Sequence, residues 1–419
     1  MPEPTELRPL LSIVADDLAG AADTAAQLAT PERPALVSLG PLPSWQPPSV
    51  LGDGKGASAW AIDADCRHVS TRECAERIRA AFGQLGWLGP CRPYLKLDST
   101  LRGNVGAALE AAQDWEGRQG VVLAPAFPER GRTVVGGALL VDGKPVAETE
   151  IATDGAAPVT ISEVAGIVRR QWNCRSAVFD PRNSHTPEEL AARLTQAIYD
   201  DFHLLVMDSQ SSQHLQMIAA AVDDPKLRHE WPGVLPAGSA GLARGFATIA
   251  GVCAPGPAQS PMHTRCGVLA VIGSRTRASA MQIEALSREG VDCLIADAPD
   301  TVGRAAAVLE SGAAVALTPG AGDHRSVAAA AADVLARLGD IGLVLSGGAT
   351  ARRFCELAGI RHMWIVGELQ PGVAVGRAVT PDSEAMPLVI KGGAAGSATV
   401  MVEAIRWLRG ESAGQGEVM

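Results

Sequence analysis

The stretch VADDLAGAADTAAQLA, residues 14–29, joins the end of an apolar run to an Ala-rich helical segment through two adjacent carboxylates. Short apolar runs such as LSIVA, PALVSL and VVLAPA alternate with amphipathic Ala-rich stretches through the first 210 residues. This alternation is typical of an α/β fold with a mostly parallel sheet. The pair Asp16 and Asp17 raises a narrower question, because capping a helix requires only one carboxylate.

The segment GVCAPGPAQSPMHTRC, residues 251–266, is rich in Pro, Gly and Ser and has little hydrophobic periodicity. Such composition indicates an inter-domain linker. After it, apolar runs such as GVLAVIGS and IGLVLSGG again alternate with helical stretches. We therefore predict two α/β domains, residues 8–250 and 267–412, each with a mostly parallel sheet flanked by helices.

Composition excludes several classes of protein. The 419 residues are 47% hydrophobic and 20% charged, which is ordinary for a soluble globular chain. The net charge of −10 and the lack of a basic run argue against nucleic-acid and membrane partners. Eight scattered cysteines without a CxxC pair predict reduced thiols and no zinc site.

The N-terminal residues are acidic and Pro-rich, and no apolar run approaches about 18 residues. We therefore expect a cytoplasmic protein. The sequence does not specify the oligomeric state, and a homodimer stays one alternative.

Three apolar runs of the second half end in turns of small residues, at residues 273–274, 346–348 and 392–396. Glycine lets a ligand approach the backbone, and free N–H groups at a helix start hold phosphate oxygens. Such turns gather at the carboxyl edge of a parallel sheet. None matches a Walker A or GxGxxG pattern, which argues against an NAD-dependent dehydrogenase. The alternative is that each turn is only a tight connection.

The first half contains YLKLDSTLRGNVGAALEA, residues 94–111, in which an apolar run ends in Lys96 and Asp98. Two hydroxyl residues follow, and Arg102 precedes a predicted helix. This mixture suits a polyhydroxy acid, because arginine binds a carboxylate in a bidentate manner, hydroxyls bond to hydroxyls and aspartate accepts a proton. The alternative is an Asp N-cap with a surface ion pair.

Together these motifs resemble the four-carbon acid sugar kinase family over about residues 10–410. The resemblance rests on the order and spacing of VADDLAGAADTA, LKLDSTLRGN, APAFPERGRTVVGGALLVDGKPVAETE, PAGSAGLARGFA, VIGSRTRASAMQIEAL, LVLSGGATA and LVIKGGAAG. Known relatives phosphorylate D-threonate, D-erythronate or 3-oxo-tetronates with ATP. The resemblance implies a sugar-acid-binding N-terminal domain, a nucleotide-binding C-terminal domain and an active site in the cleft between them.

The resemblance also assigns residues to the two ligands. To the sugar acid it assigns Asp16, Asp17, Gly20, Lys96, Asp98, Ser99 and Arg102. Arg67, in the polar cluster AIDADCRHVS at residues 61–70, is a further substrate-binding candidate, although that cluster alone is uninformative. To ATP it assigns Ser274, Gly347, Gly348, Ala349, Thr350, Gly392, Gly393 and Gly396. Phosphoryl transfer needs a carboxylate that orients or deprotonates the attacking hydroxyl, and the candidates are Asp17 and Asp98. Asp16, which is closer to the strand, is expected to hold neighbouring backbone or cations.

Three positions depart from the family pattern. Ala19 stands where relatives usually have Thr, Ala349 where many have Asp or Glu, and Ala395 where Phe is common. The first is expected to alter substrate preference. The second removes a carboxylate near the phosphates, so we predict no protein metal ligand and Mg²⁺ held mainly by ATP and water. A non-catalytic sensor that kept the two-domain shell is the rival interpretation, motivated by Ala349 and opposed by the intact Asp17.

Overall fold

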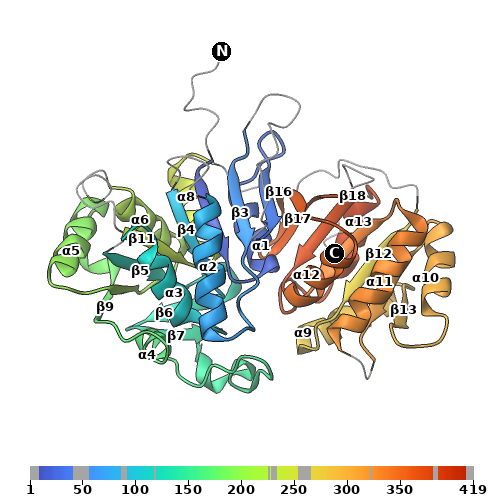
Figure 1. Ribbon diagram of the computed structural model, residues 1–419, viewed down its shortest axis with the longest axis horizontal. Helices are drawn as coiled ribbons and strands as arrows, with labels where there is room; N and C mark the ends of the chain where they lie inside the picture. Colours follow the sequence, from blue (N-terminus) through green and yellow to red (C-terminus); the bar gives the residue numbers. More distant parts are fainter. Residues whose placement is uncertain are drawn as a thin grey trace, which may run out of the picture. The chain divides into compact units, whose positions relative to one another are not determined.

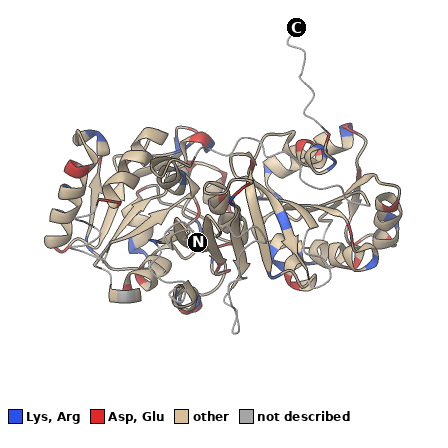
Figure 2. Cartoon of the chain, turned by 90° about the horizontal axis from the view of Figure 1, so that it is seen from above, with Lys and Arg blue, Asp and Glu red and all other residues tan. Residues whose placement is uncertain are grey.

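A computed structural model describes residues 9–40, 56–85, 92–117, 119–224, 227, 234–252, 266–320, 323–380 and 386–411 (Figure 1). The chain divides into two compact units. The first unit consists of residues 1–28 and 40–254, and the second unit of residues 29–39 and 255–419. No helix among the described residues is long and apolar enough to cross a membrane. Acidic and basic residues are interspersed in both units (Figure 2).

The first unit is built on a sheet whose described strand pairs are all parallel. Its strand order is β3-β1-β4-β11-β5-β10-β9. The bounds are β1 Leu11–Ala15, β3 Ala59–Asp63, β4 Arg92–Lys96, β5 Gly120–Ala124, β9 Ser176–Phe179, β10 Leu204–Met207 and β11 Val234–Gly238. Strands β1, β5 and β10 are buried along their whole length, because helices cover both faces of a parallel sheet.

The helices of the first unit form two layers (Figure 1). Helices α2, α3 and α4 contact one another in one layer, and α1, α8, α6 and α5 contact one another in the other. Their bounds are α1 Leu18–Ala26, α2 Thr71–Leu85, α3 Val105–Asp114, α4 Val164–Arg169, α5 Pro187–Tyr199, α6 Ser212–Val222 and α8 Ala240–Ile249. All nine residues of α1 are buried, and their small size lets the helix pack closely on the sheet.

A small antiparallel sheet follows β5. It consists of β6 Arg132–Val135, β7 Ala138–Val141 and β8 Lys144–Pro145. The first unit also contains short 3₁₀ helices: η2 Trp115–Gly117, η3 Pro128–Arg130, η4 Val146–Glu148, η5 Glu150–Thr153 and η6 Pro181–Asn183.

The second unit has the strand order β13-β14-β12-β15-β18-β17-β16-β2. The first five strands are parallel, and the last three pair antiparallel. The bounds are β2 Ala35–Leu39, β12 Val268–Ile272, β13 Asp292–Ile295, β14 Ala314–Thr318, β15 Gly342–Ser346, β16 His362–Gln370, β17 Val373–Val379 and β18 Met386–Lys391. Helices α10, α11 and α12 lie together, as do α9 and α13. They span α9 Arg277–Arg288, α10 Thr301–Glu310, α11 His324–Leu338, α12 Gly348–Leu357 and α13 Val400–Leu408.

Strand β2 departs from the domain bounds expected from the sequence. It lies within the predicted first domain, residues 8–250, but the structure groups residues 29–39 with the second unit. The reason is its pairing, because β2 runs antiparallel to β16 with Ser38 opposite His362. Ser38 Oγ and His362 Nδ1 are 3.0 Å apart. Most of the predicted linker 251–266 lies outside the described residues.

Strand register aligns the chemistry at the carboxyl edge of each sheet. In the first unit Ala15 of β1 pairs with Asp63 of β3 and with Lys96 of β4, so residues 16–17 and 97–98 leave the sheet at the same edge. In the second unit Ile272 pairs with Ser346, and Ser346 pairs with Lys391. The three glycine-bearing turns of that unit therefore emerge beside one another.

Candidate functional site

Asp17 is the N-cap of α1. Its Oδ1 accepts a hydrogen bond from Gly20 N at 2.8 Å, and its Oδ2 accepts one from Arg67 Nη1 at 2.8 Å. The capping alternative raised by the sequence is therefore correct for one carboxylate of the pair. Each Asp17 oxygen keeps a second lone pair, so capping does not exhaust the acceptor capacity of this side chain.

Asp16 holds Arg67 in a bidentate ion pair instead of capping the helix. Arg67 Nε lies 2.8 Å from Asp16 Oδ2, and Arg67 Nη2 lies 2.9 Å from Asp16 Oδ1. Burial works against the charge of Arg67, but Asp16, Asp17 and Asp98 together raise its pKa well above the usual range. Arg67 is therefore a permanent cation that draws three carboxylates to one point.

Asp98 is enclosed by donors. Arg102 Nε and Nη2 donate to its two oxygens at 2.8 and 3.1 Å, and Thr100 Oγ1 donates to Oδ2. Burial would raise the pKa of Asp98, but the charges of Arg102 and Arg67 and these hydrogen bonds hold it well below the usual range. Asp98 is thus a firmly ionised carboxylate and a weak proton acceptor.

Arg102 is shared between two carboxylates. Besides Asp98, its Nη1 donates to Asp154 Oδ2 at 3.2 Å. Burial opposes ionisation of Asp154, whereas N–H groups of Ala156 and Ala157 and the charge of Arg102 lower its pKa. Asp154 was missing from the sequence-based set, and its sequence context of small and polar residues offers no signal of this role.

Lys96 brings a buried cation to the same edge. Lys96 is 4% exposed, and its Nζ makes no hydrogen bond or ion pair with any residue that the structure describes. A Cβ on Gly20 would lie 2.8 Å from Lys96 Nζ and 2.6 Å from Asp17 Oδ1. Gly20 therefore leaves room for both groups, and a larger residue there would displace one of them. Ser99, which is 9% exposed, likewise makes no side-chain hydrogen bond within the described part of the chain.

Two further arginines follow β5 at this edge and were not identified from the sequence. Arg130 Nη1 lies 3.6 Å from Asp23 Oδ2 on α1, one helical turn beyond Gly20. Arg132 Nε is buried and has no hydrogen-bond partner among the described residues, and burial followed by the charge of Arg130 lowers the pKa of Arg132. The available signal was PERGR, in which two arginines flank a glycine just after a buried strand.

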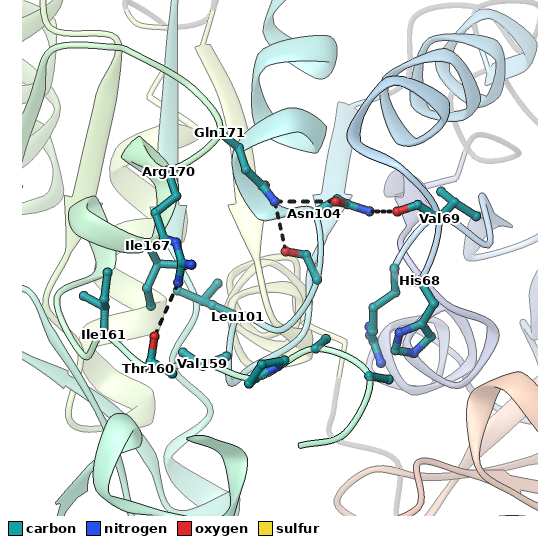
Figure 3. A pocket seen from close by; sticks show the side chains of 15 residues that line it. His68, Val69, Leu101, Asn104, Val159, Thr160, Ile161, Ile167, Arg170 and Gln171 are labelled. Carbon is teal, nitrogen blue, oxygen red and sulfur yellow. Dashed lines mark hydrogen bonds between the residues drawn. The ribbon is translucent and has the colours of Figure 1, made fainter. Parts of the chain in front are cut away.

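A pocket of about 440 Å³ opens beside Arg67 (Figure 3). Its lining includes His68, Asn104, Arg170 and Gln171, and no Asp or Glu is among the lining residues. Asn104 Nδ2 donates to Val69 O at 2.8 Å, and Arg170 Nη1 to Thr160 Oγ1 at 3.4 Å. Burial and then the charge of Arg67 lower the pKa of His68. The pocket shares Arg67 with the carboxylate network, but Asp17, Lys96 and Asp98 do not line it.

The turns of the second unit differ in how their helices begin. Thr276 caps α9 by accepting from Ser279 N at 3.3 Å. In contrast, α12 begins after Gly347, which has φ +101° and provides no side-chain cap. The first N–H groups of α12 are thus left for another acceptor, which is the arrangement that binds anions at helix N-termini. Ala349 is exposed in this first turn, and Thr350 is buried.

Close packing joins the three turns. A Cβ on Gly273 would collide with Thr350 Oγ1, and a Cβ on Gly393 would collide with Ser274 Oγ. Gly396 has φ +81°, a backbone conformation that favours glycine. Gly392 is open to its surroundings, because a Cβ there would meet no atom of the described residues within 4 Å. Ala395 is 1% exposed and belongs to the core cluster of this unit. The residues assigned to ATP therefore lie together, as do those assigned to the sugar acid.

Comparison with known proteins defines the class. Residues 11–246 match the model of a sugar-binding N-terminal domain, and residues 269–401 match that of a nucleotide-binding C-terminal domain. A D-threonate kinase of Bordetella bronchiseptica is 31% identical, covering 96% of this chain and 98% of the relative. A 3-oxo-tetronate kinase of Cupriavidus necator is 27% identical, with 96% and 98% covered.

A solved structure shows the same fold. The crystal structure of a Haemophilus influenzae protein of family DUF1537 matches with a TM-score of 0.72 at 20% identity, covering 95% of this chain and 100% of that one.

The two family models and the similar kinases show that the chain is a two-domain phosphotransferase with an alcohol group as acceptor. It belongs to the four-carbon acid sugar kinase family.

Proposed function

We propose that this protein transfers the γ-phosphoryl group of ATP to a hydroxyl of a four-carbon sugar acid of the threonate, erythronate or oxo-tetronate type. The observation that carries the proposal is the buried ammonium of Lys96, which has no partner among the described residues. A buried cation without a counter-ion is costly, so an anionic ligand at this point stabilises the protein as it binds. The carboxylate of a sugar acid has the required charge.

We assign to Asp17 the role of orienting the attacking hydroxyl and accepting its proton. In phosphoryl transfer the protein mainly positions the nucleophile, and a carboxylate that accepts its proton assists. Asp98 is poorly suited to this role because Arg102 and Thr100 occupy its oxygens and its pKa is well below the usual range. Asp17 retains a free lone pair on each oxygen and lies next to the space around Lys96 that Gly20 leaves.

Arg102 was expected to grip the substrate carboxylate. Its guanidinium is already paired with Asp98 and Asp154, although two of its five N–H groups remain for a ligand. We therefore give the primary carboxylate contact to Lys96 and a supporting contact to Arg102. Arg132, whose buried Nε has no hydrogen-bond partner in the described part of the chain, is a further donor near this edge.

For ATP, the proposal relies on the uncapped start of α12 and on the open side of Gly392. Both features suit phosphate oxygens, since backbone N–H groups and an unobstructed main chain permit close approach. Mg²⁺ would be held by the phosphates and water, because the exposed first turn of α12 carries Ala349 instead of a carboxylate. The cleft between the domains, the homodimer and the cytoplasmic location stay predictions.

The test is a coupled assay of ADP release with D-threonate, D-erythronate and 3-oxo-tetronates as acceptors. We expect ADP release that depends on one of these acids. A non-catalytic sensor would instead bind an acid or ATP, seen as a raised melting temperature, without releasing ADP. Binding without turnover over the whole panel would therefore overturn the kinase proposal.

A further inference from the structure

Lys391 is the last residue of β18 and stands directly before Gly392 and Gly393. Its position beside a glycine pair resembles that of a lysine that contacts phosphate, yet the residue is only 1% exposed. Its Nζ donates to Gln282 Oε1 at 3.0 Å, to Ser346 Oγ at 3.1 Å and to Gly393 O at 3.0 Å. An ammonium has three N–H donors, so these protein acceptors use all of them.

Gln282 continues the same network from α9. The residue is 1% exposed, and while its Oε1 accepts from Lys391, its Nε2 donates to Ala395 O at 3.1 Å and to Ser397 O at 3.0 Å. Together, Lys391 and Gln282 hold the turn after β18 at the carbonyls of every second residue, Gly393, Ala395 and Ser397. Ser279, one helical turn earlier on α9, adds a bond from its Oγ to Gly393 O at 3.0 Å.

The network reaches the turn after β15 as well. The Lys391 side chain bonds to Ser346, and the Lys391 carbonyl accepts from Gly347 N at 3.0 Å. Lys391 is therefore bonded both to the turn that contains Gly347, the N-cap of α12, and to Gly393 in the turn after β18. Both turns belong to the set that the proposed function gives to ATP.

We infer that Lys391 and Gln282 are a positioning pair that holds the turns after β15 and β18 at the spacing required by ATP, and that Lys391 itself does not contact phosphate. This inference rests on the proposed nucleotide binding. The physical reason is that backbone N–H groups bind phosphate well only when they are held in place beforehand, and a buried, fully bonded network provides that rigidity.

Two substitutions distinguish positioning from direct contact, measured by calorimetry of Mg·ATP binding to the full chain. Lys391→Met keeps the length of the side chain but removes its charge and donors. Gln282→Leu keeps the Lys391 charge but removes the bonds to Ala395 and Ser397. We expect each to weaken ATP binding about tenfold or more, and the double variant to lose less than the product of the two losses, because both act through one network.

Direct contact with phosphate predicts a different pattern. Gln282→Leu would then leave ATP affinity within about twofold, since the cation would remain available. That result in a folded variant overturns the inference, and it stands even if Lys391→Met fails to fold. A matched control is Gln370→Leu, which removes the bonds of Gln370 to Ser397 N and Oγ in the same turn but leaves Lys391 and Gln282 unchanged. An equal loss in this control would indicate general loosening of the turn and would also overturn the inference.

A second readout separates positioning from loss of structure. The KM for ATP should rise in both variants, while the KM for the sugar acid changes little. If the wild-type protein binds no ATP, the proposed function fails. If the wild type binds ATP and Gln282→Leu binds it equally well, only the inference fails.

Discussion

The carboxyl edge of the first unit carries opposed formal charges, whereas the residues of the second unit that are assigned to ATP are glycine, alanine, serine and threonine. In the first, Arg67 and Arg102 are each bound by two carboxylates within 3.2 Å. In the second, no side chain among the described residues caps the start of α12, and Lys391 is buried.

This difference fits the two ligands that the proposed function assigns to the edges. A sugar acid presents hydroxyls and one carboxylate, which are distinguished by directed charged side chains. Phosphates accept many equivalent hydrogen bonds, which backbone N–H groups provide when glycine lets them approach. We therefore expect the two edges to respond differently to charge removal and to added side-chain volume.

Asp16→Asn should give the largest loss of stability. It leaves the buried Arg67 without its bidentate partner, and breaking such a pair costs about 3 kcal/mol. This exceeds the cost of about 1 kcal/mol expected for a helix cap. Chemical denaturation measures the difference. The control is Asp114→Asn, whose exposed partner is Arg79 at 2.9 Å, and which should cost less than about 1 kcal/mol. Equal costs would contradict the role given to Asp16.

Asp17→Asn should lower kcat by roughly 100-fold or more while the affinity for the sugar acid changes little. The amide still caps α1 through its oxygen but no longer accepts a proton. Asp98→Asn is the competing variant, and we expect it to affect stability and sugar-acid affinity more than kcat. Steady-state kinetics of both variants decide the assignment. A fully active Asp17→Asn with an inactive Asp98→Asn would reverse it.

Lys96→Met should raise the KM for the sugar acid by roughly 10- to 100-fold, because that factor corresponds to the loss of one charge-assisted hydrogen bond. The KM for ATP should change by no more than about twofold. Arg102→Ala should also raise the KM for the acid, but by less, because its guanidinium is partly occupied by Asp98 and Asp154. A larger effect of Arg102→Ala on the acid would return the primary contact to that residue. Equal changes for acid and ATP would place neither cation at the acid.

The stabilisation by Asp98 should depend on pH. The pKa of Asp98 in the folded protein lies below the usual aspartate value. Its contribution to the free energy of unfolding is therefore complete at a pH above the usual value, and it is lost as the pH falls through the folded pKa. The difference in melting temperature between wild type and Asp98→Asn should therefore be constant near neutral pH and shrink below about pH 4. A difference that stays constant down to pH 2 would contradict the ion pairs at this edge.

Gly392→Ala should produce the smallest effect, a several-fold loss of ATP affinity without loss of stability. The added Cβ meets no atom of the described residues within 4 Å, so we expect only a ligand close to the backbone to sense it. Gly83→Ala on α2 is the matched control, since its Cβ also meets nothing and it should leave ATP binding unchanged. Calorimetry that finds equal ATP affinity for Gly392→Ala and wild type would exclude close approach at this turn.

Much of the fold and candidate site was accessible from local sequence patterns. Apolar runs ending in Asp16, Lys96 and Gly273 predicted parallel strands, and functional groups follow such strands at the carboxyl edge. Family motifs then supplied the class of enzyme, which the comparisons confirm. These conclusions need only the order of residue types along the chain.

Only the tertiary structure decided which groups meet. Asp16 binds Arg67 across 51 residues, and β2 joins β16 through Ser38 and His362 across 324 residues. Lys391 has the sequence context of a phosphate ligand, but its ammonium is turned into the protein toward Gln282. The spacing of apolar residues and the residue types in turns depend on neighbours along the chain, so they can be predicted from sequence. Ion pairs, burial and the number of donors left free depend on strand register and helix packing, which bring together residues that are distant along the chain.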